Sequence, residues 1–211
     1  MNRRALVVIV GPTASGKSRL AVCLAKKFNG EVVSADSRQV YKGLDIGSNK
    51  IPPEEQEGIP HHLLDVVSPT EHFTAARYQE VAERAIEDIQ GRGKIPFLVG
   101  GTPFYIYAIT EGWNFPRVQP DPELRAHLEQ ESTETLYKTL QELDPERAAT
   151  IEKSNKRRLI RALEIVQKTG KPVPSLANRQ LPYPVLFLGL AGEPEELKQR
   201  IAQRLRTRLE Q

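Results

Sequence analysis

Apolar residues along the chain form two kinds of segment: short continuous runs, and longer stretches in which they recur with helical spacing. The continuous runs lie at residues 5–10, 31–34, 95–102 and 184–192, and their length and β-branched content predict buried strands. Helical spacing runs through residues 17–28 and 74–93 and returns in the last stretch from residue 194, where Leu197, Ile201, Leu205 and Leu209 recur every four residues. Strands that alternate with helices in this way predict an α/β fold with a doubly wound, mostly parallel sheet.

Residues 113–182 have a different pattern. They hold several segments with helical spacing but no apolar run typical of a strand, and they are entered and left through proline-rich sequence. We therefore expect a small helical insertion domain at 113–182. The α/β core is then discontinuous and consists of residues 1–112 and 183–211.

Composition narrows the class of protein. Hydrophobic residues make up 39% and charged residues 27% of the chain, and the longest apolar runs are far too short to span a bilayer. We therefore expect a soluble protein with no membrane association. Cys23 is the single cysteine, so no intramolecular disulfide can form, and a reducing cytoplasm is the expected compartment.

Charge is distributed unevenly between the two parts of the chain. From residue 151 onward there are 13 Lys and Arg against 6 Asp and Glu, whereas the first 150 residues carry 17 against 21. A basic second part favours a polyanionic partner, although basic helix faces are also often simply solvated.

The segment between the first strand and the first helix reads GPTASGKS and fits the phosphate-loop pattern G-x-x-x-x-G-K-[ST]. Its residues are Gly11, Pro12, Thr13, Ala14, Ser15, Gly16, Lys17 and Ser18. The glycines let the backbone amides point at anionic oxygens, Lys17 adds a full charge, and the Ser18 hydroxyl can ligate Mg²⁺. The motif predicts a P-loop NTPase-like core and a polyphosphate site. It leaves open whether a nucleotide or another diphosphate binds.

Two further residues follow strands whose carboxyl ends share one edge of the predicted sheet. Asp36 comes after the second strand, and Thr102 ends the Gly-Gly-Thr turn after the third. Asp36 can serve as a metal partner or a general base, or it can form an Asx-turn or cap before the next segment. Thr102 can contact a ligand or cap the helix that follows it.

Several stretches together resemble the bacterial tRNA dimethylallyltransferases, also called IPP transferases. The matching segments occur in the family's order at residues 11–18, 34–50, 61–69, 100–108 and 143–165. The resemblance implies that the loop receives the diphosphate of dimethylallyl diphosphate. The dimethylallyl group then passes to the N6 amine of adenosine 37, next to the anticodon of tRNA, and diphosphate leaves with Mg²⁺.

The resemblance also implies roles for single residues. Lys17, Asp36 as general base and Thr102 are the expected catalytic residues, with Ser18 on the metal. The residues expected to contact tRNA are Asp36, Ser37, Arg38, Gln39, Thr102, Arg125, Arg157, Arg158, Leu159, Ile160 and Arg161. We expect a monomer in the cytoplasm.

Three alternatives stay open at the level of sequence. The chain can instead be an adenylate isopentenyltransferase, a small-molecule P-loop kinase, or a non-catalytic P-loop protein that binds RNA. Chains of the resembling family extend further than this one, so either a truncated or a naturally short form is possible. The pattern does not decide between a solvated face and a diphosphate or RNA contact for Arg200, Arg204 and Arg208, which share a helix face.

Overall fold

The structure is a computed structural model that describes residues 5–116, 118–176 and 178–210. Its α/β part begins with β1 (Leu6–Val10), α1 (Lys17–Phe28), β2 (Gly30–Ser34), α2 (Asp45–Ser48), the 3-10 turn η1 (Pro53–Gln56) and β3 (His61–His62). It continues with α3 (Ala75–Gly91), β4 (Ile95–Val99) and α4 (Pro103–Thr110), and it ends with β5 (Val185–Gly189) and α9 (Pro194–Leu209).

These strands form one five-stranded sheet in the order β3-β2-β4-β1-β5, and every pair in it is parallel. The predicted α/β fold with a doubly wound parallel sheet is confirmed. The four apolar runs all form strands, although the run at 95–102 ends as a strand at Val99 and continues as a turn. β3 was not predicted, because two histidines are too short a segment to show any apolar periodicity.

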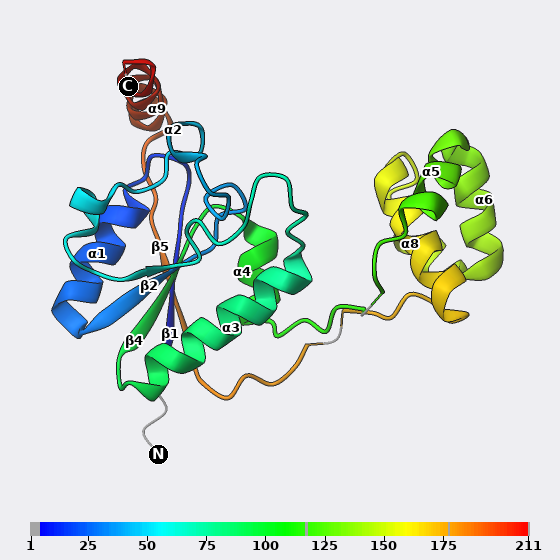
Figure 1. The fold of residues 1–211 in the computed structure, drawn as a ribbon, viewed down its shortest axis with the longest axis horizontal. Coiled ribbons are helices and arrows are strands. Elements are labelled where there is room, and N and C mark those ends of the chain that lie inside the picture. The colour runs from blue at the N-terminus through cyan, green and yellow to red at the C-terminus, as the bar shows by residue number, and fades with distance from the viewer. Residues whose placement is uncertain (1–4, 117, 177, 211) are drawn as a thin grey trace. The chain divides into compact units, whose positions relative to one another are not determined.

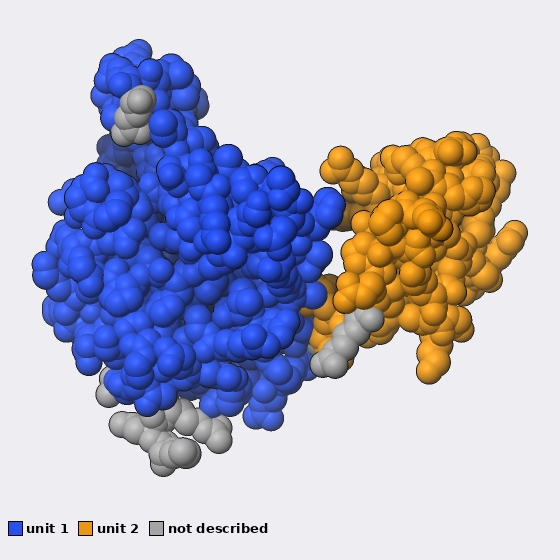
Figure 2. Space-filling view, in the orientation of Figure 1, with its two compact units in different colours: residues 1–113, 178–211 blue, residues 114–177 orange. Residues whose placement is uncertain are grey.

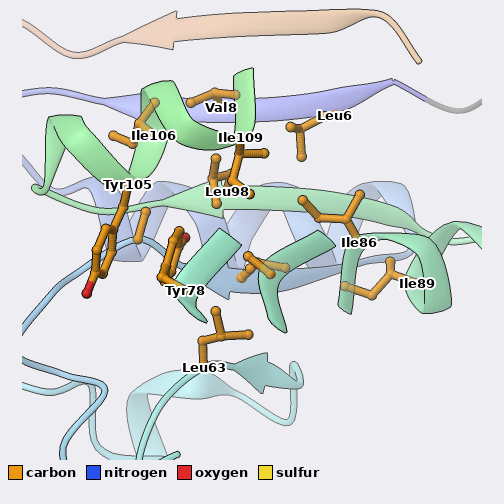
Figure 3. Close-up of a cluster of buried hydrophobic side chains, with 13 residues drawn as sticks. Leu6, Val8, Leu63, Tyr78, Ile86, Ile89, Leu98, Tyr105, Ile106 and Ile109 are labelled. Atoms are coloured by element: carbon orange, nitrogen blue, oxygen red, sulfur yellow. The ribbon is translucent and has the colours of Figure 1, made fainter. Parts of the chain in front are cut away.

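Helices cover both faces of the sheet (Figure 1). On one face, small residues of α1 such as Ala21 and Ala25 pack on Val32 and Phe97. On the other face, α3 and α4 bury their apolar stripes against β1, β2 and β4. Figure 3 shows this second core, in which the ring of Tyr78 stacks on that of Tyr105 with centroids 3.8 Å apart.

The chain divides into two compact units, coloured separately in Figure 2. Unit 1 is the α/β part, residues 1–113 and 178–211, and unit 2 comprises residues 114–177. Unit 2 is helical, with α5 (Pro122–Gln130), α6 (Thr133–Leu143), α7 (Pro145–Thr150) and α8 (Lys156–Thr169). Each of these helices begins after a capping side chain that accepts a backbone N–H: Asp121, Ser132, Asp144 and Asn155 respectively. Unit 2 has its own apolar core, built largely from α6 and α8.

The parallel sheet brings three connections to one edge of unit 1. The phosphate loop follows β1, Asp36 follows β2, and the Gly-Gly-Thr turn follows β4. In open α/β sheets this carboxyl edge is where ligands bind, so the fold itself places the candidate residues together. None of the described helices is both long and apolar enough to cross a membrane.

Candidate active site

The phosphate loop has the backbone of an anion-binding nest. Ala14 adopts φ 63° and Gly16 φ 90°, both left-handed, and Gly16 directly precedes α1. Successive amides in such a conformation point into one concavity, and the N-terminus of the 12-residue α1 adds the positive end of its dipole. This backbone arrangement is one that commonly binds anions.

Lys17 lies in this loop with its ammonium against the loop's own backbone. Its Nζ donates to the carbonyl oxygens of Gly11, at 2.8 Å, and Pro12, at 2.7 Å. Burial lowers the pKa of Lys17 and the positive charge of Arg204 lowers it further, whereas the Asp36 carboxylate raises it. Two cations and one carboxylate are thus close enough to influence one another, and an anion placed among them relieves the repulsion between Lys17 and Arg204.

Ser37, the residue after Asp36, is hydrogen-bonded to Thr102. The Ser37 backbone N–H donates to Thr102 Oγ1 at 2.9 Å, and the Thr102 hydroxyl donates to Ser37 Oγ at 3.3 Å. The Thr102 backbone N–H also donates to the Ala35 carbonyl at 3.1 Å. Thr102 occupies the position before α4, but its hydroxyl does not cap that helix. Its side chain instead fixes the turn that presents Asp36.

The Asp36 carboxylate shapes its own turn with one oxygen only. Oδ1 accepts the Arg38 backbone N–H at 2.8 Å and that of Gln39 at 3.4 Å, which is the Asx-turn that the local sequence allows. Oδ2 makes no hydrogen bond to the part of the chain that the structure describes. The turn and a chemical role are therefore compatible, because the second oxygen can accept a proton.

Tyr105 was not predicted, yet it lies close enough to Asp36 for the charge of that carboxylate to act on its phenol. Its pKa is raised to about 12 by burial first, and then by Tyr41 and by the charge of Asp36. Figure 3 shows its ring at the end of the buried cluster, stacked on Tyr78.

The residues present fit a magnesium ion held mainly by substrate. No group of three or more His, Cys, Asp or Glu suited to a metal occurs among the described residues. Mg²⁺ commonly keeps several waters and binds through one or two protein oxygens together with substrate phosphates. The exposed Ser18 hydroxyl beside the anion nest is such an oxygen.

In unit 2, two of the predicted tRNA contacts are engaged by a buried carboxylate. Arg125 donates from Nε and Nη2 to Glu164 at 2.8 and 2.7 Å, and Arg161 pairs with the same side chain. Burial raises the pKa of Glu164, but hydrogen bonds from Arg125, the Asp121 amide and Arg161 outweigh it and lower the pKa to about 2. Both arginines therefore hold the helical unit together, whatever else they contact.

The remaining predicted residues of unit 2 separate into two groups. Leu159 is 0% and Ile160 5% exposed, and both pack in the core. Because neither side chain is exposed, a tRNA contact at these two positions is left to their backbone, and it stays a prediction. Arg157 and Arg158 are exposed on α8, and Arg158 pairs with Glu152 at 3.4 Å.

The C-terminal helix α9 lies near α2 (Figure 1). Arg208 Nη1 donates to the Ile46 and Gly47 carbonyls, both at 3.4 Å, and the charge of Arg204 reaches Lys17. The four-residue spacing of arginines along α9 was a signal for this face, but only the fold shows that it approaches the phosphate loop.

Comparison with known proteins agrees with this geometry. The family model described as IPP transferase matches residues 39–211. The chain belongs to the IPP transferase family. A tRNA dimethylallyltransferase of Roseiflexus sp. (strain RS-1) is 52% identical over 181 residues, covering 84% of this chain and 59% of that protein. The one of Thermomicrobium roseum is 48% identical over 208 residues, covering 96% of this chain and 63% of that protein.

Solved structures give the same family. The full-length tRNA isopentenylpyrophosphate transferase from Bacillus halodurans is 42% identical, with a TM-score of 0.67 over 99% of this chain and 67% of that one. A eukaryotic dimethylallyltransferase, described as acting on tRNA, is 38% identical, with a TM-score of 0.83 over 98% of this chain and 53% of that one. This chain thus spans about six tenths of the length of the first two curated relatives.

Proposed function

We propose that this protein transfers the dimethylallyl group of dimethylallyl diphosphate to the N6 amine of adenosine 37 in tRNA and releases diphosphate. The observation that carries the proposal is the union of two features at one sheet edge. An anion nest with Lys17 lies beside Asp36, whose turn is fixed by Thr102 and whose Oδ2 accepts no hydrogen bond from the described residues. Relatives named for this activity support the assignment.

The nest and Lys17 are suited to stabilise a leaving group. When the allylic carbon–oxygen bond breaks, negative charge develops on the diphosphate, and the loop amides and the Lys17 ammonium lie where that charge forms. Arg204 adds a second cation to the same region. When bound, Mg²⁺ supplies further neutralisation of this charge, with the Ser18 hydroxyl as its protein ligand.

Asp36 is suited to remove a proton. As the adenine amine forms its bond to the allylic carbon it must lose one proton, and Oδ2 of Asp36 is the acceptor that we assign. The Asx-turn through Oδ1 and the Thr102–Ser37 hydrogen bonds hold this carboxylate in place. An adenine stacked in a tRNA loop must be rotated out of the stack to reach the Asp36 carboxylate.

The basic second part of the chain supports a nucleic-acid substrate. Arg157 and Arg158 are exposed on α8 in a unit whose arginines Arg125 and Arg161 are already ordered by Glu164. This surface argues against a free adenine nucleotide as acceptor. Of the described strands β1, β2, β4 and β5, only β2 is followed within two residues by an acid, Asp36. The lack of a further acid there argues against a kinase, since kinases of this class use one for the metal. A monomer in the cytoplasm, where tRNA is modified, completes the proposal.

One experiment separates these alternatives. The chain is incubated with prenyl-labelled dimethylallyl diphosphate, Mg²⁺ and unmodified tRNA, with AMP and ATP as acceptors in parallel reactions. We expect label in tRNA, at a single adenosine. Label in the free nucleotide selects the adenylate isopentenyltransferase, and RNA binding without any transfer selects the non-catalytic protein.

A further inference from the structure

A small cleft on the α1 side of the sheet lies next to the phosphate loop, and of its polar lining only Ser18 has a role in the proposed reaction. It lies at the carboxyl ends of β2 and β4, and its polar lining consists of Ser18, Ser34, Gln39 and His61. The volume of the cleft that the centre of a water molecule can occupy is about 20 Å³. One water molecule needs about 10 to 15 Å³ of such space, so the cleft is large enough for a water.

His61 presents an unpaired acceptor to this cleft. Its Nδ1 lies 2.8 Å from the Ile59 carbonyl oxygen, which can only accept, so Nδ1 carries the proton. Burial lowers the pKa of His61, against the opposing effect of the Ile59 hydrogen bond, and this favours the neutral ring. Nε2 is then a lone pair. It is buried and has no donor among the residues that the structure describes.

The other polar groups of the cleft partly satisfy one another. The Gln39 amide nitrogen donates to the Asn49 carbonyl at 3.1 Å, which turns its Oε1 towards Ser34 Oγ, 3.5 Å away. The Ser34 hydroxyl proton is therefore engaged by Gln39 Oε1. His61 Nε2 is an acceptor without a donor among the described residues, and the Ser18 hydroxyl is able to donate. A water between these two groups donates to His61 and accepts from Ser18.

We propose that the cleft holds one ordered water that donates a hydrogen bond to His61 Nε2 and accepts one from the Ser18 hydroxyl. Through this water, His61 is a positioning residue for Ser18. The Ile59 carbonyl sets the donor-to-acceptor direction of these hydrogen bonds, since it fixes the proton of His61 on Nδ1. The Ser18 O–H then points into the cleft, and its lone pairs are left for the metal and diphosphate. This inference rests on the proposed role of the loop as a diphosphate site.

The test measures binding of inorganic diphosphate to the full 211-residue chain by calorimetry, with and without Mg²⁺. We expect His61→Phe to weaken the affinity in Mg²⁺ about 3- to 10-fold, the range expected for one hydrogen bond. His61→Gln, which keeps an acceptor near the position of Nε2, is expected to restore most of it. The matched control is His62→Phe on the same short strand: His62 pairs with Glu31 and does not line the cleft, so its affinity stays unchanged.

A double-mutant cycle distinguishes positioning from a general structural effect. If His61 acts through Ser18, His61→Phe has no further effect in a Ser18→Ala background. A high-resolution crystal structure is expected to show a water within hydrogen-bond distance of His61 Nε2 and Ser18 Oγ. The inference is overturned by equal effects of His61→Phe and His62→Phe, or by an unchanged effect of His61→Phe in the Ser18→Ala background. A cleft without that water also overturns it. A coupled His61–Ser18 pair in a chain that transfers no prenyl group overturns the proposed function alone.

Discussion

Gly100 lies where the turn after β4 packs directly against the backbone just before Asp36. A Cβ built at Gly100 lies 2.1 Å from the Ala35 carbonyl oxygen and 2.3 Å from its carbon. Contacts of a Cβ below 3.0 Å are essentially never seen. Gly100→Ala therefore forces the backbone after β4 away from the backbone before Asp36 by roughly 1 Å, and neither side is a flexible side chain.

The cost follows from this overlap. Overpacking against fixed groups costs typically about 1–3 kcal/mol, and a clash with backbone on both sides belongs near the upper end. For a unit of this size, 1 kcal/mol corresponds to roughly 2–4 °C in Tm, so we expect a loss of about 6–12 °C. A displacement of roughly 1 Å between Asp36 and Thr102 is expected to lower kcat by about 100-fold.

Gly101→Ala is the matched control, because nothing lies within 4 Å of its Cβ position. Thermal unfolding followed through Trp113, the single tryptophan, reports on unit 1. If Gly100→Ala and Gly101→Ala melt within a degree or two of each other and transfer equally well, the close approach of the two connections does not organise the site.

Further predictions concern single groups. Lys17→Ala is expected to weaken diphosphate binding roughly 10- to 100-fold, as for a charged hydrogen bond, and unchanged calorimetric affinity contradicts its role. Asp36→Asn keeps the Oδ1 turn but cannot take the proton, so single-turnover transfer is expected to vanish while tRNA still binds; substantial turnover refutes the base. Because the pKa of Glu164 is lowered from 4.5 to about 2, its ion pairs stabilise unit 2 above about pH 4.5 and are lost as pH falls towards 2. Acid titration of helicity tests this, and Glu164→Gln must remove the transition in that window. Arg157→Ala is expected to reduce the salt dependence of tRNA binding by about one phosphate contact, and an unaltered slope excludes α8 from the RNA surface.

Sequence patterns predicted the parts of this site that are local in the chain. The phosphate loop follows from a fixed spacing between a β-branched run and a helix, and Asp36 follows from the end of the next apolar run. The Ser37–Thr102 hydrogen bond joins residues 65 positions apart, and no local pattern predicts that β2 and β4 are neighbours in the sheet. The fold, not the motif, therefore supplies the contact that orders Asp36.

In unit 2, the sequence pattern predicted an exposed arginine but not the buried carboxylate that orders two others. A basic helix predicts solvent-facing arginines, and for Arg157 this is what the structure shows. For Arg161 the i,i+3 spacing to Glu164 was a visible signal, yet a charged residue is rarely fully buried, so Glu164 at 0% exposure was not anticipated. Its burial depends on Arg125, which approaches from a different helix.

The central claim is that the phosphate loop holds a leaving group rather than a nucleotide. The most direct measurement uses dimethylallyl diphosphate that carries ¹⁴C in the prenyl group and ³²P in the diphosphate, with unmodified tRNA and without ATP. The account predicts ¹⁴C in tRNA and ³²P in free diphosphate, in equal amounts, with both products lost in Lys17→Ala. If no ¹⁴C enters tRNA, the account is wrong, and if products form only when ATP is added and hydrolysed, the loop binds a nucleotide instead.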